Sequence, residues 1–403
     1  MGTQASYTAR GLHAQARLLH LGRIRWNSPA WIVLLAAVAL SVFGDMAIAT
    51  TEPGIAKRQG MFLPIAMIGA MIVAIPDYRN ARRFVPVMAA ISLGLLIFIL
   101  IPIVPSWIVR PYNGARRWIN FVVMDFQPSE LAKVVWVLAM ALWLRGGSKT
   151  LRTWKGFLLP FLVTLVPMGL ILVEPDLGTA LLFVPTLLAM LLVAGARLRH
   201  VAIFVFAGLV LVWSVAFGPV KAYLKPHQQA RIDALVYQLQ GDDRFQDDIG
   251  FQGDRAMTII GSGGIEGIGA ERAATLIRFN ALPEEHNDMI FAVITCRWGV
   301  YGAVAIWGLY LLFAAGGLAV AALSRDTFGR LLAVGVVVML FLQMLINTGM
   351  TIGVLPITGM TLPFVSSGGS SLVMTWVMVG LILNVGLRRP RRMERWETGG
   401  ERA

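Results

Sequence analysis

The sequence holds a single cysteine, Cys296, among 403 residues. One cysteine excludes an internal disulfide and any cysteine-based metal cluster. No His/Cys spacing indicates zinc, and the glycine-rich stretch 261–269 lacks the Gly-Lys-Ser/Thr ending of an ATP-binding P-loop. The Gly-x-Ser-x-Gly elbow of many hydrolases is also absent. The sequence therefore argues against several common enzyme classes and predicts no resident metal ion.

Charge is scarce. Charged residues make up 14% of the chain and apolar residues 57%, whereas about a quarter of a soluble protein is charged. A membrane-spanning helix needs about 20 mostly apolar residues. We therefore expect an all-α polytopic membrane protein of about ten transmembrane helices with a large extracytoplasmic loop between spans 7 and 8. The apolar runs cover residues 29–50, 61–76, 84–105, 127–145, 156–173, 176–195, 200–218, 289–323, 331–354 and 369–388.

The distribution of basic residues predicts the orientation. The net charge is +13, but 21 of the 35 basic residues fall in short segments on the side of the N-terminus. This bias is the positive-inside pattern, so both termini are expected in the cytoplasm and no nucleic-acid partner is expected. The domains follow as a cytoplasmic tail over 1–28, a membrane domain over 29–388 and a basic cytoplasmic tail over 389–403. Arginines from Arg388 onward are expected to anchor the last helix to anionic membrane lipid.

Three longer segments fall on the outer side, at residues 106–126, 219–288 and 356–371. Within the second, residues 242–248 are acidic and should be solvated, while 255–269 are glycine-rich and are expected to dip toward the bilayer against protein. The third is uncharged and rich in proline and glycine, which predicts a buried re-entrant hairpin. Because all three segments share one side, they can converge on a site there.

Asp288 is the strongest catalytic candidate. It closes the 219–288 loop directly before an apolar run, and a carboxylate at a membrane boundary is costly unless it is used. The alternative is a plain helix N-cap. Glu284 and Glu285 should raise its pKa, and a nearby basic side chain should lower it. His286 is either a proton relay or simply a solvated side chain.

Other charged residues occur near the outer ends of the spans. Glu130 and Lys133 are three residues apart and can pair on one helix face, as a structural salt bridge or as ligand-binding groups. Arg116 and Arg117 lie on the outer side against the charge bias, which suggests an anionic ligand, or else anchoring together with Trp118. Glu174 and Asp176 are expected in a tight turn. The two acids are either a binding site for a cation or a sugar hydroxyl, or part of a capped, solvated turn.

Together these motifs resemble the SEDS family of cell-wall polymerases, which includes RodA and FtsW. Six pieces stand in family order and carry the resemblance: Gly114-Ala115-Arg116-Arg117-Trp118, Gln127-Pro128-Ser129-Glu130-Leu131-Ala132-Lys133, Glu174-Pro175-Asp176-Leu177-Gly178-Thr179, Gly261-Ser262-Gly263-Gly264, Leu282 to Ala292, and Leu362 to Ser371. Departures are Cys296-Arg297, where the family usually has Glu-Glu, and Ser367, where it usually has Tyr.

The resemblance implies a peptidoglycan glycosyltransferase in the bacterial inner membrane that polymerises lipid II with inversion, with a class B penicillin-binding protein as partner. Asp288 corresponds to the family's proposed catalytic residue. The short tails favour the RodA branch, although Glu174 is more like the division branch. We expect substrate contacts from Arg116, Arg117, Glu130, Lys133, Asp176, Ser262, Glu285 and His286. No tightly bound cofactor is expected, although a divalent cation (Mg²⁺ or Mn²⁺) could assist. The alternatives are a lipid flippase and a non-catalytic scaffold.

Overall fold

The structure is a computed structural model that describes residues 25–112, 115–121, 124–216 and 251–388, together with the single positions 218, 222, 229 and 233. The predicted acidic stretch 242–248 and nearly all of both tails lie outside these residues. The described helices are α2 (Ala30–Thr51), α3 (Pro53–Ala74), α4 (Tyr78–Ala81), α5 (Val85–Leu100), α6 (Pro128–Leu144), α7 (Ser148–Leu151), α8 (Trp154–Val173), α9 (Leu177–Val193), α10 (Leu198–Ala216), α12 (Phe251–Gly263), α13 (Ala270–Asn280), α14 (Ile290–Leu323), α15 (Thr327–Thr351) and α16 (Gly369–Leu387).

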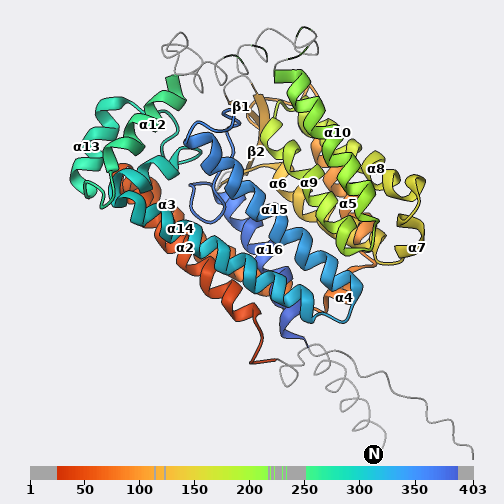
Figure 1. The fold of residues 1–403 in the computed structure, drawn as a ribbon. Coiled ribbons are helices and arrows are strands. Elements are labelled where there is room, and N and C mark those ends of the chain that lie inside the picture. Colours follow the sequence, from red (N-terminus) through yellow and green to blue (C-terminus); the bar gives the residue numbers. More distant parts are fainter. Residues whose placement is uncertain are drawn as a thin grey trace, which may run out of the picture.

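Each predicted apolar run corresponds to one long helix of the bundle in Figure 1. Six of these helices are long and apolar enough by composition to cross a membrane, and α5 and α9 are shorter apolar helices. The prediction of a polytopic, helical membrane protein is therefore confirmed. Three boundaries were wrong by four residues or more, one of them the start of the ninth span, where α15 begins at Thr327 instead of 331. The second span begins earlier, because Pro53 starts helix α3, and the third ends at Leu100, just before Pro102 and Pro105.

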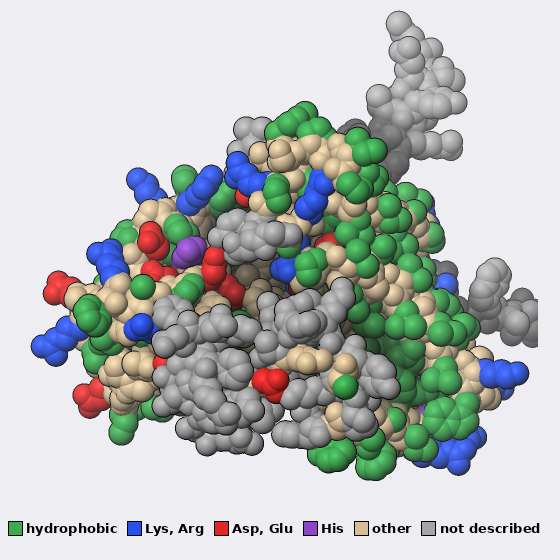
Figure 2. Space-filling view, turned by 90° about the horizontal axis from the view of Figure 1, so that it is seen from above, with side chains coloured by type: hydrophobic (Ala, Val, Ile, Leu, Met, Phe, Trp, Pro, Cys, Tyr) green, Lys and Arg blue, Asp and Glu red, His purple; other side chains and the backbone are tan. Residues whose placement is uncertain are grey.

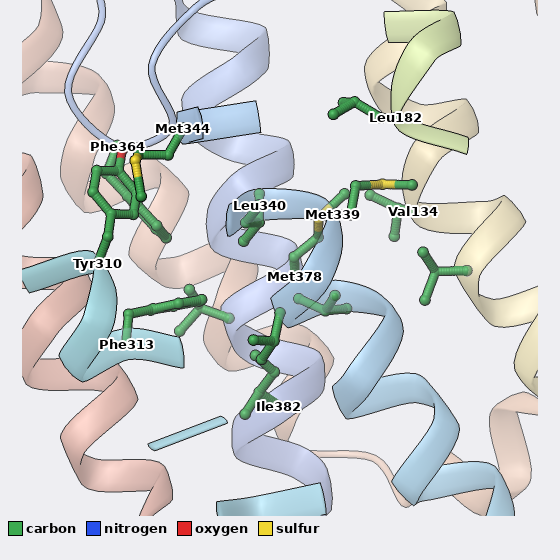
Figure 3. Packing of buried hydrophobic residues seen from close by; sticks show 14 of the residues in the cluster. Val134, Leu182, Tyr310, Phe313, Met339, Leu340, Met344, Phe364, Met378 and Ile382 are labelled. Carbon is green, nitrogen blue, oxygen red and sulfur yellow. The ribbon is translucent and has the colours of Figure 1, made fainter. Parts of the chain in front are cut away.

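Helices α15 and α16 form the centre of the bundle. About 72% of the apolar window of each is buried inside the protein, against 11% for α10, which therefore faces outward. Figure 3 shows Met339, Leu340 and Met378 filling the space between these helices, with Phe313 on one side and Val134 and Leu182 on the other. Burial of this kind in the membrane depends on close packing, since lipid is as apolar as the side chains.

A small antiparallel sheet lies at the upper end of the bundle in Figure 1. Its strands are β1 (Val109–Tyr112), β2 (Ala115–Phe121) and β3 (Met124–Phe126), with Val109 opposite Ile119 and Ile119 opposite Phe126. The sequence analysis did not predict strands here, because short segments interrupted by arginine, proline and glycine carry little alternation. We call this end of the bundle the site end, and the end where Arg25 and Arg388 lie the tail end.

Helix α14 is broken at Gly299, where another segment of backbone is inserted. Gly299 has φ of 63°, and the adjacent loop after α12 supplies the hydrogen bonds that the break removes. Ile268 N–H donates to Cys296 O (3.0 Å), and Val300 N–H donates to Gly264 O (3.1 Å). The expectation of an irregular segment over 255–269 was therefore wrong for its first half, which is helix α12. The second half is irregular and mostly exposed, and several of its backbone groups form hydrogen bonds with α14.

Candidate active site

Asp288 ends a tight turn at the site end, directly before α14. The N–H groups of Asn287 and Met289 both donate to Glu284 O, at 3.0 and 3.2 Å. The N-cap of α14 is Met289, and no side chain caps this helix. The alternative that Asp288 serves as the N-cap is therefore wrong, because the turn places its carboxylate outside the capping position. Asp288 as a residue is partly exposed, and no hydrogen bond to its carboxylate from another described residue is present.

The 356–368 segment clamps this turn through side chains and backbone. Ser367 N–H donates to His286 O (2.9 Å), and the Ser366 hydroxyl donates to Asn287 O (2.5 Å). The Ser367 hydroxyl also donates to Asn287 Oδ1. Ser367, a departure from the family pattern, is thus used as a hydrogen-bond donor to the catalytic turn. The prediction of a buried, irregular hairpin over 356–371 is confirmed for residues 362–367, which are buried and not helical, whereas 356–359 are exposed or partly exposed and α16 begins at Gly369.

Asn347 of α15 forms hydrogen bonds with both the Asp288 turn and the 356–368 segment. Its side-chain amide donates to Asp288 O (2.8 Å) and to Met360 O (2.6 Å). In the same segment, a side chain built on Gly359 would come within 3.4 Å of Asp288 Oδ2. The sequence analysis missed Asn347, although an asparagine within an apolar run was a signal. Three separate parts of the chain therefore fix the backbone of Asp288.

The electrostatics of Asp288 favour a base that works near neutral pH. Burial, together with the charge of the neighbouring Glu284 carboxylate, raises its pKa from 3.8 to about 6. A hydrogen bond from its own backbone N–H and the charge of Arg117 act in the opposite direction. A general base is most effective when its pKa lies near the working pH. Asp288 is thus mostly ionised at pH 7 and yet more basic than an ordinary aspartate.

The two predicted arginines separate. Arg117 Nε donates to Glu174 O (2.9 Å) and Nη2 to Pro175 O, so the guanidinium lies at the α8–α9 turn, where its charge acts on Asp288. Arg116 instead donates to Pro102 O (3.0 Å) and Val104 O (2.6 Å) after α5. Arg116 therefore holds a loop, and its predicted contact with an anionic substrate stays a prediction without support from this geometry.

Glu174 is a buried carboxyl beside Arg117. Its side chain is 1% exposed, and neither oxygen has a hydrogen-bond partner. Burial, followed by the charge of Asp176, raises its pKa to about 9, while Arg117 acts to lower it. Glu174 is therefore neutral at pH 7, which leaves the positive charge of Arg117 available at the site.

Asp176 has a structural use. Its carboxylate caps α9 by accepting from Thr179 N–H (3.1 Å). It also accepts from Gln127 Nε2 (3.2 Å) and Ser129 Oγ (3.3 Å), which ties α9 to the start of α6. The side chain is buried, so its predicted role in substrate binding remains a prediction.

Glu130 and Lys133 form the predicted pair inside the membrane. Lys133 Nζ lies 2.9 Å from Glu130 Oε1 and donates to Gln343 Oε1 at 3.0 Å. Gln343 Nε2 in turn donates to Thr361 O (2.9 Å). Lys133 is 1% exposed, so it does not reach an open surface in this structure. This geometry supports the structural alternative, in which the pair holds α6, α15 and the 356–368 segment together.

The remaining predicted residues lie at different places. Glu285 and His286 belong to the same turn as Asp288, but burial raises the pKa of Glu285 near Thr51 and Glu52 at the end of α2. Ser262 is exposed on α12 and lies 3.7 Å from Cys296 Sγ, about 12 Å along α14 from Asp288 at the usual rise per residue. The structure therefore does not bring Ser262 to Asp288.

Arg297 is turned away from Asp288. Its guanidinium donates to Met46 O (2.7 Å) and Thr50 Oγ1 (2.8 Å) of α2 and lies over the Trp298 ring. It is absent from the charges that act on the pKa of Asp288. The departure from the family's acidic pair at this position therefore fastens α14 to α2.

The site end is hollowed. Figure 2 looks onto this face and shows a depression with acidic side chains in its wall and a basic side chain opposite. A separate apolar cavity of about 220 Å³ begins at Phe291, one turn from Asp288, and runs between α12, α14 and α15 past Thr295 and Val300. Within the part of the chain that is described, no three His, Cys, Asp or Glu side chains are grouped to hold a metal ion.

These features define a polytopic membrane protein with an aspartate held in place in a partly exposed turn at one end of the helical bundle. The Cell cycle protein family of FtsW, RodA and SpoVE matches residues 24–390. The chain belongs to this family.

Relatives and solved structures agree. The chain is 34% identical to a probable peptidoglycan glycosyltransferase FtsW of Geobacter metallireducens, over 89% of this chain and 94% of that protein. It is 33% identical to stage V sporulation protein E of Bacillus subtilis, over 82% of this chain and 86% of that protein. A chain from a peptidoglycan synthase complex described as coordinating polymerization and crosslinking superposes with a TM-score of 0.74 at 31% identity, covering 88% and 97%. The structure of Thermus thermophilus RodA superposes with a TM-score of 0.64 at 28% identity, covering 88% of this chain and 96% of that chain.

Proposed function

We propose that this chain is a peptidoglycan glycosyltransferase that joins lipid II units into glycan strands at the site end. One observation carries the proposal: Asp288 is a partly exposed residue with a raised pKa, in a turn that Asn347 and Ser367 hold by hydrogen bonds. The match to relatives named peptidoglycan glycosyltransferase supports it. A fixed base at a membrane face suits a substrate whose lipid lies in the bilayer.

In the proposed reaction, Asp288 accepts the proton of the acceptor sugar's 4-hydroxyl as that oxygen attacks the anomeric carbon of the donor. The bond from that carbon to the lipid pyrophosphate breaks, and the configuration inverts. One carboxylate is enough, because pyrophosphate already leaves readily and needs no general acid. Arg117 lies where its charge can act on the pyrophosphate, and a guanidinium fork suits phosphate oxygens. A divalent cation (Mg²⁺ or Mn²⁺) would accompany the pyrophosphate.

Orientation and partner belong to the same proposal. The site end faces the outside of the bacterial inner membrane and both termini face the cytoplasm, because basic residues concentrate at the tail end. The partner is a class B penicillin-binding protein, which would crosslink the strands; the similar chain in a synthase complex supports this. The apolar cavity beside Phe291 has room for part of a hydrocarbon chain.

The test uses purified full-length protein in vesicles, with and without a class B partner, and labelled lipid II. Glycan length is read on a gel, and movement of labelled lipid between leaflets is measured in the same vesicles. The proposal expects polymer without lipid movement. Lipid movement without polymer under any partner condition would identify a flippase instead, and neither activity beside a stimulated transpeptidase would identify a scaffold.

A further inference from the structure

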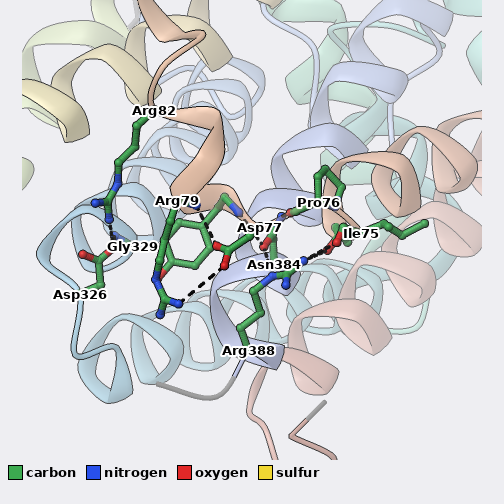
Figure 4. A network of polar contacts seen from close by, with 11 residues as sticks. Ile75, Pro76, Asp77, Arg79, Arg82, Asp326, Gly329, Asn384 and Arg388 are labelled. Carbon is green, nitrogen blue, oxygen red and sulfur yellow. Dashed lines mark hydrogen bonds and ion pairs between the residues drawn. The ribbon is translucent and has the colours of Figure 1, made fainter. Parts of the chain in front are cut away.

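A second polar cluster lies at the tail end of the bundle, opposite Asp288. Asn384 of α16 organises it, as Figure 4 shows: its amide donates to Val73 O and Pro76 O (both 2.6 Å), and its oxygen accepts from Tyr78 N–H (3.3 Å). Arg388 Nε donates to the same oxygen at 2.7 Å. The end of α16 is thus fixed against the turn between α3 and α4.

This cluster borders a small cavity with a strongly basic lining. The cavity volume is about 20 Å³, and four arginines line it: Arg25, Arg79, Arg325 and Arg388. They come from four separate parts of the chain, namely the approach to α2, helix α4, the α14–α15 turn and the end of α16. Among the described residues, no acidic side chain is part of the lining. Since one water needs about 10–15 Å³, the cavity admits an oxygen or two of a larger group that remains outside.

The positive charge at this cavity is poorly compensated. Arg388 is held by neutral acceptors, namely Asn384 Oδ1 and the carbonyls of Ala74 and Ile75. Arg79 makes a long contact of 3.8 Å with Asp77, lies over the Tyr78 ring and is also attracted by the charge of Asp326. Asp326, the other carboxylate nearby, is paired with Arg82. Within the described residues, neither Arg25 nor Arg325 forms an ion pair. Four like charges brought together in this way repel one another, and an anion among them relieves the repulsion.

We propose that this cavity binds the phosphate group of an anionic phospholipid in the membrane leaflet at the tail end. Arginine suits phosphate because its fork of N–H donors matches the oxygens. The cavity is too small for a whole headgroup, which fits a diester phosphate that enters by its oxygens while glycerol and acyl chains stay in the leaflet. The preset position of Arg388 distinguishes the site from a diffuse basic surface. Binding here would brace α16, which packs along α3 and α2 at the centre of the bundle.

The test compares two double variants of the full-length protein. Arg25→Gln with Arg325→Gln removes two charges from the cavity without breaking a hydrogen bond that either side chain makes within the described residues. Arg83→Gln with Arg152→Gln removes the same charge from exposed positions at the tail end that do not line the cavity. Native mass spectrometry of protein released from detergent counts retained phosphatidylglycerol and phosphatidylcholine. Inorganic phosphate is added in a parallel arm.

The wild type should retain phosphatidylglycerol in preference to phosphatidylcholine. The cavity variant should lose that preference by about 10-fold, given the usual contribution of each arginine near anionic lipid. The control should lose clearly less, because its arginines do not line the cavity that holds the phosphate. Equal loss in both variants would overturn the proposal in favour of diffuse surface charge. Binding of inorganic phosphate with the same arginine dependence, but no preference between the lipids, would overturn the lipid assignment and identify a soluble phosphate as the ligand.

Discussion

The side-chain amide of Asn347 donates a hydrogen bond of 2.8 Å to the main-chain carbonyl of Asp288. The same amide donates to Met360 O, so one side chain of a central helix fixes both the catalytic turn and the segment that covers it. A base can be positioned through its backbone in this way while its carboxylate stays available to substrate.

Asn347→Ala should reduce turnover more than substrate binding. The variant leaves two carbonyl groups without their donor, which should lower the free energy of unfolding by about 1–3 kcal/mol. Misplacement of the base should reduce kcat by about 10- to 100-fold with KM little changed. Polymerisation kinetics and thermal unfolding in detergent measure the two effects. Thr186→Val is the control, because it removes a hydrogen bond within helix α9 only. An equal kcat for both variants would contradict the positioning role.

The pH dependence of polymerisation should follow Asp288. Its pKa of about 6 predicts activity that rises with pH on an acidic limb centred near 6, because the base must be ionised. Glu284→Gln should move this limb to lower pH, since the Glu284 carboxylate raises that pKa. Glu271→Gln, on exposed α13, is the control and should leave the limb in place. A limb that does not move in Glu284→Gln would exclude Asp288 as the titrating group.

The contribution of Asp288 to folding stability should change with pH in the opposite direction to activity. Because the folded pKa of Asp288 lies above its ordinary value of 3.8, the folded state binds the proton more tightly. The contribution of this group to stability is therefore full below about pH 4 and is lost as the pH rises through 6. Asp288→Asn should remove that part of the pH dependence, which unfolding curves measured between pH 4 and 7 can detect.

The apolar runs predicted the helices because spanning a membrane imposes a length and composition on each one. The Glu130–Lys133 pair was also predictable, since three residues of spacing place both on one helix face. Its third member, Gln343, was not, because that contact joins segments 210 residues apart. The hydrogen bonds from Ser366 and Ser367 to the Asp288 turn could not be predicted for the same reason. Asp288 was indicated by its position directly before an apolar run and then by the resemblance, and only coordinates could show that it does not cap its helix.

Lys133→Met should destabilise the protein by about 3–5 kcal/mol, because Glu130 is then left charged and unpaired in a buried place. The double variant Glu130→Gln with Lys133→Met removes both charges and should recover more than half of the lost stability and polymerisation. Thermal unfolding and glycan synthesis are measured on all three proteins. A double variant that folds like the wild type but makes no polymer would instead give the pair a direct role in substrate binding.

Gly299→Ala should weaken the packing between α14 and the loop after α12. A Cβ at Gly299 would lie 2.3 Å from Ile265 O, and the positive φ is unfavourable for alanine. Strain and clash together should lower the free energy of unfolding by about 2–4 kcal/mol. Gly308→Ala, in the same helix with open space around it, should be neutral or stabilising by up to about 1 kcal/mol. Similar unfolding temperatures for the two variants would show that the inserted loop is not held as described.

The most direct test of the account is glycan synthesis by Asp288→Asn in the purified, full-length protein. Asparagine keeps the size of the side chain and the backbone contacts of the turn but cannot accept the proton. With the unfolding temperature close to that of the wild type, polymer formation from lipid II should fall by at least about 100-fold at every pH. Polymer of wild-type length and amount from this variant would contradict the assignment of Asp288 as the base.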